Sequence, residues 1–220
     1  MNLKHILLLA FSIMLILTSC TSTKNVEETI PDPNFIGDID PIQLDNIMCI
    51  RQSFGKLKPA ELEVYFIPRT NIIEVYFRDG MNEYCILFNE TERNVFAEGI
   101  ILYAQDILKY REDPRSALPE REATRKNYYT EGTMSVSWGV IGLPHNNTTT
   151  FQTNYEYLEQ NKPYFELMVE STQDSEDDTT NSPVVRLYFS PTHLETLMEE
   201  LSQERLVGLV REKEEEAFAF

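Results

Sequence analysis

A strand-to-helix junction that occurs twice most constrains how this chain can fold. Residues 87–91 read Leu-Phe-Asn-Glu-Thr and residues 188–192 read Tyr-Phe-Ser-Pro-Thr. Each ends an apolar strand in Phe and continues with a short polar residue, Asn89 or Ser190, of the kind preferred at a helix N-cap. Glu92 completes a capping box with Asn89, and proline follows Ser190 at the first helical position. Both junctions therefore predict a helix directly after a strand.

Alternating apolar and polar residues precede each junction and predict strands with one buried face. The predicted strands are residues 62–67, 73–77 and 84–88 in the first half, and residues 134–140, 151–157, 165–169 and 185–189 in the second. Asp79-Gly80 is a hairpin signal between two of them. Residues 46–54 complete the first half as a strand, although Ile47–Ile50 would also suit a helix.

Helical periodicity follows each set of strands. The first apolar stripe, whose members recur at spacings of four, three and four, contains Phe96, Ile100, Tyr103 and Ile107. We predict that this helix ends near Arg111, before Pro114. The predicted apolar face of the closing helix consists of Leu194, Leu197, Met198 and Leu201.

The predicted fold class is α+β. Two tandem antiparallel units, each of four strands followed by one helix, form one compact domain over residues 46–205, and residues 206–220 form a charged C-terminal helix or tail. Two such units resemble the PUR-repeat and whirly families of single-strand nucleic-acid binders in topology. Nineteen Lys and Arg against 36 Asp and Glu give a net charge of −17, which disfavours nucleic acid as a partner.

The N-terminus predicts export. Residues 1–19 combine a basic start with an apolar run too short to span a bilayer, which is typical of a signal peptide. Leu-Thr-Ser at residues 17–19 before Cys20 resembles the lipobox of bacterial lipoproteins, which implies acylation of Cys20 and a lipid anchor in the membrane. The alternatives are an ordinary cleaved signal with a chance cysteine and a poor membrane helix. Residues 20–45 are predicted to be a lipidated tether, and Thr21 in place of Asp favours the outer over the inner membrane.

Three short segments resemble a group of uncharacterised spirochaete lipoproteins. They are Thr-Arg-Lys-Asn-Tyr at residues 124–128, Val-Ser-Trp-Gly at residues 136–139 and Arg-Leu-Tyr-Phe-Ser at residues 186–190. The resemblance implies a compartment and a fold, and no activity.

No catalytic or metal-binding motif is present in the sequence. His145 and His193 lack a second ligand at metal spacing, and no Gly-x-Ser-x-Gly elbow occurs. The alternating acids of residues 174–178 lack the glycine and the twelfth-position glutamate of a calcium loop. We therefore predict no enzyme, no cofactor and no metal.

Cys49 and Cys85 are the two thiols that remain after acylation of Cys20. In an oxidising compartment they are a candidate disulfide, which would stabilise the fold by about 3–4 kcal/mol. The alternative is two buried, reduced thiols.

The leading hypothesis is a membrane-anchored, non-enzymatic binding or structural module of the cell envelope. Its candidate interaction face consists of Tyr65, Tyr76, Tyr155 and Tyr157. One alternative is a hydrolase of envelope polymers that uses acidic residues such as Glu166 and Glu170. A second alternative is a single-strand nucleic-acid binder, which the charge disfavours.

Overall fold

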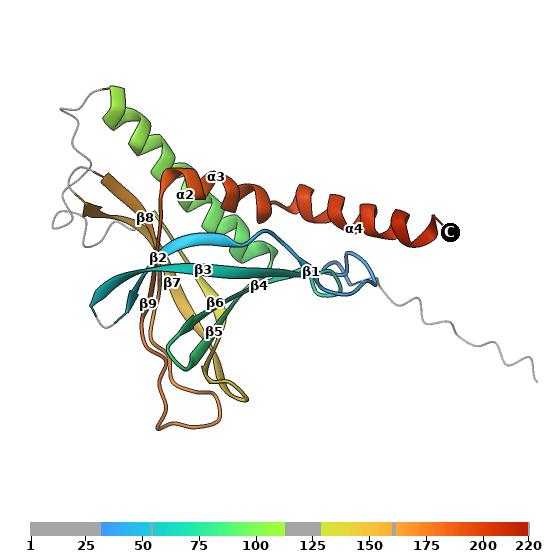
Figure 1. Ribbon diagram of the computed structural model, residues 1–220, viewed down its shortest axis with the longest axis horizontal. Coiled ribbons are helices and arrows are strands. Elements are labelled where there is room, and N and C mark those ends of the chain that lie inside the picture. Colours follow the sequence, from blue (N-terminus) through green and yellow to red (C-terminus); the bar gives the residue numbers. More distant parts are fainter. Residues whose placement is uncertain (1–31, 54, 113–128, 160–161, 220) are drawn as a thin grey trace, which may run out of the picture. The chain divides into compact units, whose positions relative to one another are not determined.

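The computed structural model describes residues 32–53, 55–112, 129–159 and 162–219. The described residues from 33 to 219 belong to one compact unit of strands and helices (Figure 1). The strands are β1 Ile42–Gln43, β2 Ile47–Ser53, β3 Lys56–Ile67, β4 Ile72–Asp79, β5 Asn82–Phe88, β6 Thr130–Val140, β7 Leu143–Glu159, β8 Lys162–Val169 and β9 Val185–Phe189. The helices are α2 Glu90–Glu112, α3 Pro191–Glu200 and α4 Gln203–Phe218.

The strands of the described chain form one antiparallel sheet, in the order β1-β3-β2-β9-β8-β7-β6-β5-β4. This sheet closes on itself because β3 also pairs with β4, from Glu63↔Tyr76 to Ile67↔Ile72. β1 lies along the same edge of β3 as β2 does, so it adds no strand to the ring. The result is an eight-stranded antiparallel barrel.

The prediction of two tandem four-strand-plus-helix units is wrong. β5 pairs with β6 from Asn82↔Val140 to Leu87↔Ser135, and β2 pairs with β9 at Ile50↔Tyr188. These pairings join the two halves of the chain into one sheet. Alternation specifies a strand and its buried face, but not its neighbour, and closure removes the edges that two separate sheets would expose. The resemblance to the PUR-repeat and whirly families rested on the tandem arrangement and loses its basis.

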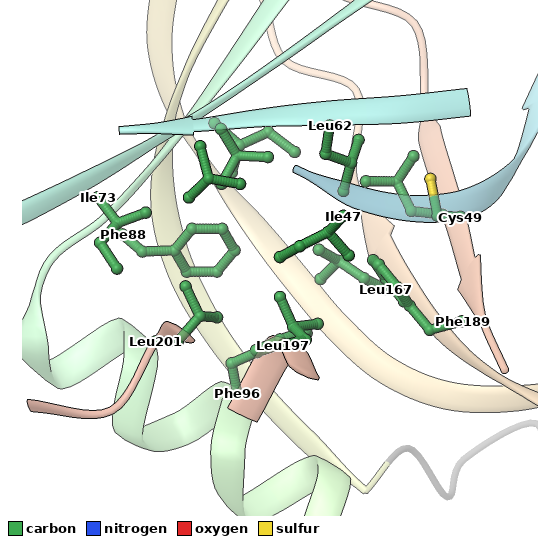
Figure 2. Packing of buried hydrophobic residues seen from close by; sticks show 14 of the residues in the cluster. Ile47, Cys49, Leu62, Ile73, Phe88, Phe96, Leu167, Phe189, Leu197 and Leu201 are labelled. Atoms are coloured by element: carbon green, nitrogen blue, oxygen red, sulfur yellow. The ribbon is translucent and has the colours of Figure 1, made fainter. Parts of the chain in front are cut away.

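The barrel interior and the helices share one hydrophobic core. In Figure 1 the helices lie along the upper side of the barrel, where β5 and β9 lead into α2 and α3. The ring of Phe96 on α2 lies 5.5 Å from that of Phe88 and 5.6 Å from that of Phe165. Leu197 of α3 points into the same cluster as Ile47 of β2 (Figure 2). Because both helices bury apolar side chains here, removal of either helix would expose the core to water.

The predicted helix starts are confirmed. The Glu92 amide donates to Asn89 Oδ1 at 3.0 Å, and the Asn89 amide donates to Glu92 Oε2 at 2.7 Å, which completes the capping box. Ser190 caps α3 by accepting from the amide of His193. The closing helix, in contrast, is interrupted, and Ser202 caps a new helix, α4, that contains the charged C-terminal segment. Sequence periodicity alone does not show this interruption.

Arg93 joins three elements at the start of α2. Its guanidinium donates to the Asn71 carbonyl at 2.8 Å, to the Phe88 carbonyl at 3.1 Å and to the Gln203 side chain at 2.5 Å. The cation is almost fully buried, and burial lowers its pKa below the ordinary value for arginine. The β3–β4 turn, the end of β5 and the start of α4 are therefore held together by one side chain.

Candidate binding cleft on the outer face of the barrel

A cleft lies on the outer face of the barrel, where β3 and β4 separate. Beyond the Glu63↔Tyr76 pair the two strands no longer contact each other in register, and each continues with only one neighbour, β2 or β5. The cleft between them has a volume of about 600 Å³. Its lining residues are Pro41, Pro59, Ala60, Glu61, Glu63, Tyr65, Ile67, Glu74, Tyr76, Phe77, Arg78 and Glu83. This volume is in the range that accommodates small molecules or a short peptide segment.

Two tyrosines form the aromatic part of the cleft. The rings of Tyr65 and Tyr76 meet edge to face, with centroids 5.9 Å apart. The Tyr76 hydroxyl donates to Glu74 Oε2 at 2.8 Å. Burial, and then the hydrogen bond to Glu74, raise the pKa of Tyr76 far above its ordinary value, so the phenol stays protonated and orients the Glu74 carboxylate.

The charged side chains of the cleft are predominantly acidic. Four carboxylates line it, on Glu61, Glu63, Glu74 and Glu83, against one cation, Arg78. The Arg78 guanidinium is 3.1 Å from Glu83, so this cation is already paired. The cleft therefore favours a positively charged ligand and repels phosphates.

A buried ion pair closes the inner side of the barrel beneath this region. Arg51 of β2 contacts Asp79 at the end of β4, and the Ser53 hydroxyl donates to the same Asp79 carboxylate at 2.6 Å. The guanidinium of Arg51 holds the pKa of Asp79 below its ordinary value. A smaller cavity of about 110 Å³ adjoins the pair, lined also by Phe77 and Tyr84. The tips of the β2–β3 and β4–β5 hairpins are thus linked inside the barrel while the cleft opens on its outside.

A profile of the protein family described as "Uncharacterised Treponema protein" matches residues 24–208. The chain belongs to this family. An uncharacterised protein of Treponema pallidum (strain Nichols) is 22% identical over 199 residues, which cover 90% of this chain and 67% of the relative. No solved structure matches the chain. The predicted resemblance to uncharacterised spirochaete proteins is confirmed at the level of the family, whose description names no activity.

The tyrosines predicted to form one interaction face in this Treponema family protein lie in two places. Tyr65 and Tyr76 line the cleft together. Tyr155 and Tyr157 lie on β7, on the opposite part of the ring, where Tyr155 is buried and Tyr157 is exposed. Their rings contact each other at 5.9 Å, and Tyr155 also contacts Tyr129. The structure therefore brings together Tyr65 and Tyr76 across β3 and β4, and Tyr155 and Tyr157 along β7, but not all four.

The acidic residues of the cleft were missed in the sequence. Glu61 and Glu63 alternate with the buried residues of β3, and Glu74 alternates with those of β4. That pattern shows that these carboxylates face outward. Charged residues are common on the exposed face of any strand, so the pattern alone does not indicate a binding site. Only the separation of β3 from β4 makes these carboxylates the walls of a cleft.

Cys49 and Cys85 are both free, buried thiols in the structure. Cys49 faces the interior from β2, whereas Cys85 lies on the outward face of β5, and β3 and β4 separate the two strands. Burial raises the pKa of each thiol to about 12, so both stay protonated and unreactive at neutral pH. The structure does not bring this candidate disulfide together.

The carboxylates proposed for hydrolysis do not face each other. Glu166 is buried on β8 and forms an ion pair with Arg186. Glu170 follows four residues later in the chain, just after the end of β8, so the Cα atoms of the two residues are about 13 Å apart at the rise of a strand. The two carboxylates therefore come from successive positions of one segment and not from opposite walls of a cleft, which the glycosidase arrangement requires.

Asp174, the first of the alternating acids in residues 174–178, takes part in structural hydrogen bonds. Asp174 accepts from His145 Nδ1 at 2.8 Å and from the Asn146 amide at 3.1 Å, and the hydrogen bond to His145 lowers the pKa of Asp174. Asp177 accepts from the Thr179 amide and hydroxyl. Within the described ranges no three His, Cys, Asp or Glu side chains are grouped as metal ligands.

The predicted signal peptide, residues 1–19, and Cys20 lie outside the described residues. The described end of the predicted tether contacts the barrel. The Ile36 amide donates to the Pro68 carbonyl at 2.9 Å, and Leu44 belongs to the core. None of the helices in the described ranges is long and apolar enough to cross a bilayer.

Proposed function

We propose that this protein is a non-enzymatic binding module of the cell envelope that takes a positively charged ligand in the β3–β4 cleft. The observation that carries the proposal is the lining of the cleft, where carboxylates from three strands surround two tyrosines. Residues 1–20 support an anchor through acylated Cys20, by the lipobox pattern alone. The function then combines a fixed position on a membrane with an acidic binding surface.

Two physical effects favour a cation in this cleft. Carboxylates on both walls of the cleft attract a cation. The net charge of −17 produces a long-range negative potential that attracts the cation as well. The faces of Tyr65 and Tyr76 provide cation–π contacts of about 0.5–1 kcal/mol each at exposed sites. The same field repels nucleic acid, which supports the choice of a cationic ligand over an oligonucleotide.

The cleft is tested with a fluorescein-labelled tetralysine amide and the full-length protein in detergent. We expect Glu63→Lys to weaken binding by about tenfold or more, because it replaces attraction by repulsion at an exposed wall of the cleft. Fluorescence polarisation measures the affinity. Binding should also weaken as NaCl is raised.

Glu212→Lys is the matched control. It makes the same change in net charge on the exposed face of α4, remote in the sequence from the cleft. Its affinity for tetralysine amide should stay close to that of the unmodified protein. Equal losses of affinity in the two variants would show that the net charge, and not the cleft, accounts for binding. An absence of binding by the unmodified protein would refute the proposal of a cationic ligand.

The lipid anchor is tested by Cys20→Ser in the bacterial host. We expect the unmodified protein in the membrane fraction, and the variant in the soluble fraction, because the variant lacks the thiol that is acylated. Metabolic labelling with an alkyne fatty acid gives an independent readout. A variant that stays with the membranes would contradict the anchor without affecting the cleft.

A further inference from the structure

The cleft contains a free strand edge. The first half of β3, Lys56–Leu62, pairs with β2 on one side and with no described residue on the other. The end of β4, Phe77–Asp79, likewise pairs only with β5. Figure 1 shows the β4–β5 hairpin turning away from β3 at this point. Pro59, Ala60 and Glu61 of the β3 edge line the cleft, so its wall includes backbone that has no strand partner.

Hairpin geometry determines which backbone groups face the opening. Ser53 and Lys56 flank a two-residue loop, and such a flanking pair is hydrogen-bonded in a hairpin. Hydrogen-bonded pairs alternate with non-bonded ones along an antiparallel ladder. The N–H and C=O groups of Leu57 and Glu61 therefore point away from β2, toward the opening. Unpaired donors and acceptors in this alternation are a template for an added strand.

The position of Pro59 is consistent with this assignment of which backbone groups of β3 face the opening. It pairs with Ile50 at a non-hydrogen-bonded position, so its nitrogen faces the opening and no ladder bond to β2 is lost. Proline is confined to edge strands for this reason. It also limits uncontrolled pairing, because it removes one donor from the middle of the edge.

The side chains beside this edge define the chemistry of the added strand. Glu61 and Glu63 project outward at alternate positions of β3, and Glu74 and Glu83 lie on the opposite wall. A strand added to β3 would place every second side chain among these carboxylates. Basic side chains at alternate positions would therefore meet opposite charges on both walls.

We infer that the occupant of the cleft is an extended segment of a basic polypeptide that adds a strand to the free edge of β3. The inference rests on the proposed function and names its partner. Backbone pairing with Leu57 and Glu61 supplies affinity, and the carboxylates select Lys or Arg at alternate positions. A small amine would use only the second of these interactions.

The test compares two labelled decapeptides of alternating Thr and Lys. One is unmodified, and the other is N-methylated at two adjacent central residues, which blocks both of its edges and leaves its charge unchanged. We expect the methylated peptide to bind about tenfold more weakly or worse, because two or more backbone hydrogen bonds are lost. Amide exchange should slow at Leu57 and Glu61 only with the unmodified peptide.

Leu57→Pro tests the same edge from the protein side. The substitution removes a donor that faces the opening and leaves the β2–β3 ladder intact, so the fold should be retained. We expect weaker binding of the unmodified decapeptide by Leu57→Pro than by Leu57→Ala, which keeps the amide. Circular dichroism and the unfolding midpoint verify that both variants are folded.

The outcomes separate the inference from the proposed function. Equal affinity for the two decapeptides, or equal affinity of the two Leu57 variants, would overturn strand addition, while binding of tetralysine amide would still support a cationic ligand. Failure of all three basic probes to bind would overturn both.

Discussion

We expect Asp79→Ala to lower the free energy of unfolding by about 3–5 kcal/mol, because it leaves the buried Arg51 guanidinium without its counter-charge. Only 9% of the Arg51 side chain is exposed, and its Nε already lacks an acceptor among the described residues. The substitution also removes the acceptor for the Ser53 hydroxyl. Both losses lie where the end of β2 is linked to the end of β4, so this end of the barrel is weakened.

Urea unfolding followed by circular dichroism measures this effect. Asp38→Ala is the matched control, because Asp38 pairs with Arg69 at 2.7 Å on the surface, where both side chains are more than half exposed. Exposed pairs contribute about 0–1 kcal/mol, so the control should change little. Replacing Arg51 by Met together with Asp79→Ala should recover part of the loss, since no buried charge is then left unpaired. Similar losses in the two single variants would contradict this account.

The same pair gives a pH dependence with a defined sign. Because Arg51 lowers the pKa of Asp79 in the folded state, the unfolded state binds the proton more tightly. The stabilisation is therefore fully present above the ordinary aspartate pKa of about 3.9 and is lost as pH falls through the lowered value. We expect the stability difference between the unmodified protein and Asp79→Ala to shrink only below about pH 4.

We expect Gly99→Ala to destabilise the protein by about 1–3 kcal/mol, although alanine is the better helix former. A Cβ at Gly99 would lie 2.3 Å from Thr153 Oγ1 and 2.8 Å from Thr130 Oγ1. These two hydroxyls are buried and hydrogen-bonded to each other at 2.7 Å, so neither can move without losing a partner. Helix α2 must then shift away from β6 and β7.

Gly208→Ala is the control for helix propensity. Gly208 lies inside α4, and apart from its own helix backbone and chain neighbours no heavy atom of the described residues lies within 4 Å of an added Cβ. This variant should gain about 0.5–1 kcal/mol. Thermal unfolding of both variants gives the comparison. Adding Thr153→Ala to Gly99→Ala should reduce the loss, and the same sign for the two glycine variants would disprove the close approach at Gly99.

The local elements of the fold were predictable because their signals are local. The caps at Asn89 and Ser190 lie where the sequence predicts them, and α2 ends at Glu112, next to the predicted Arg111. β2 occupies Ile47–Ser53, where the sequence also allowed a helix. Short apolar runs suit both states, and pairing with β3 and β9 decides between them.

The candidate site was only half predictable. Tyr65 and Tyr76 alternate with the buried residues of β3 and β4, so their outward direction is visible in the sequence, and both line the cleft. The others, Tyr155 and Tyr157, belong to a strand on another part of the ring. The side of a strand to which a residue points follows from the local sequence. Which residues from different strands lie next to one another depends on the order of the strands in the sheet.

The sequence by itself determined most of the strands, the starts of α2 and α3, the acidic charge and membership of a spirochaete protein family. Tertiary structure decided that β5 meets β6 and β2 meets β9, so that two predicted units became one closed barrel. It also decided that β3 and β4 separate beyond Glu63 and Tyr76, which creates the acidic cleft and its free edge. The physical reason is that periodicity records which face of a segment is buried, while pairing depends on segments far apart in the chain.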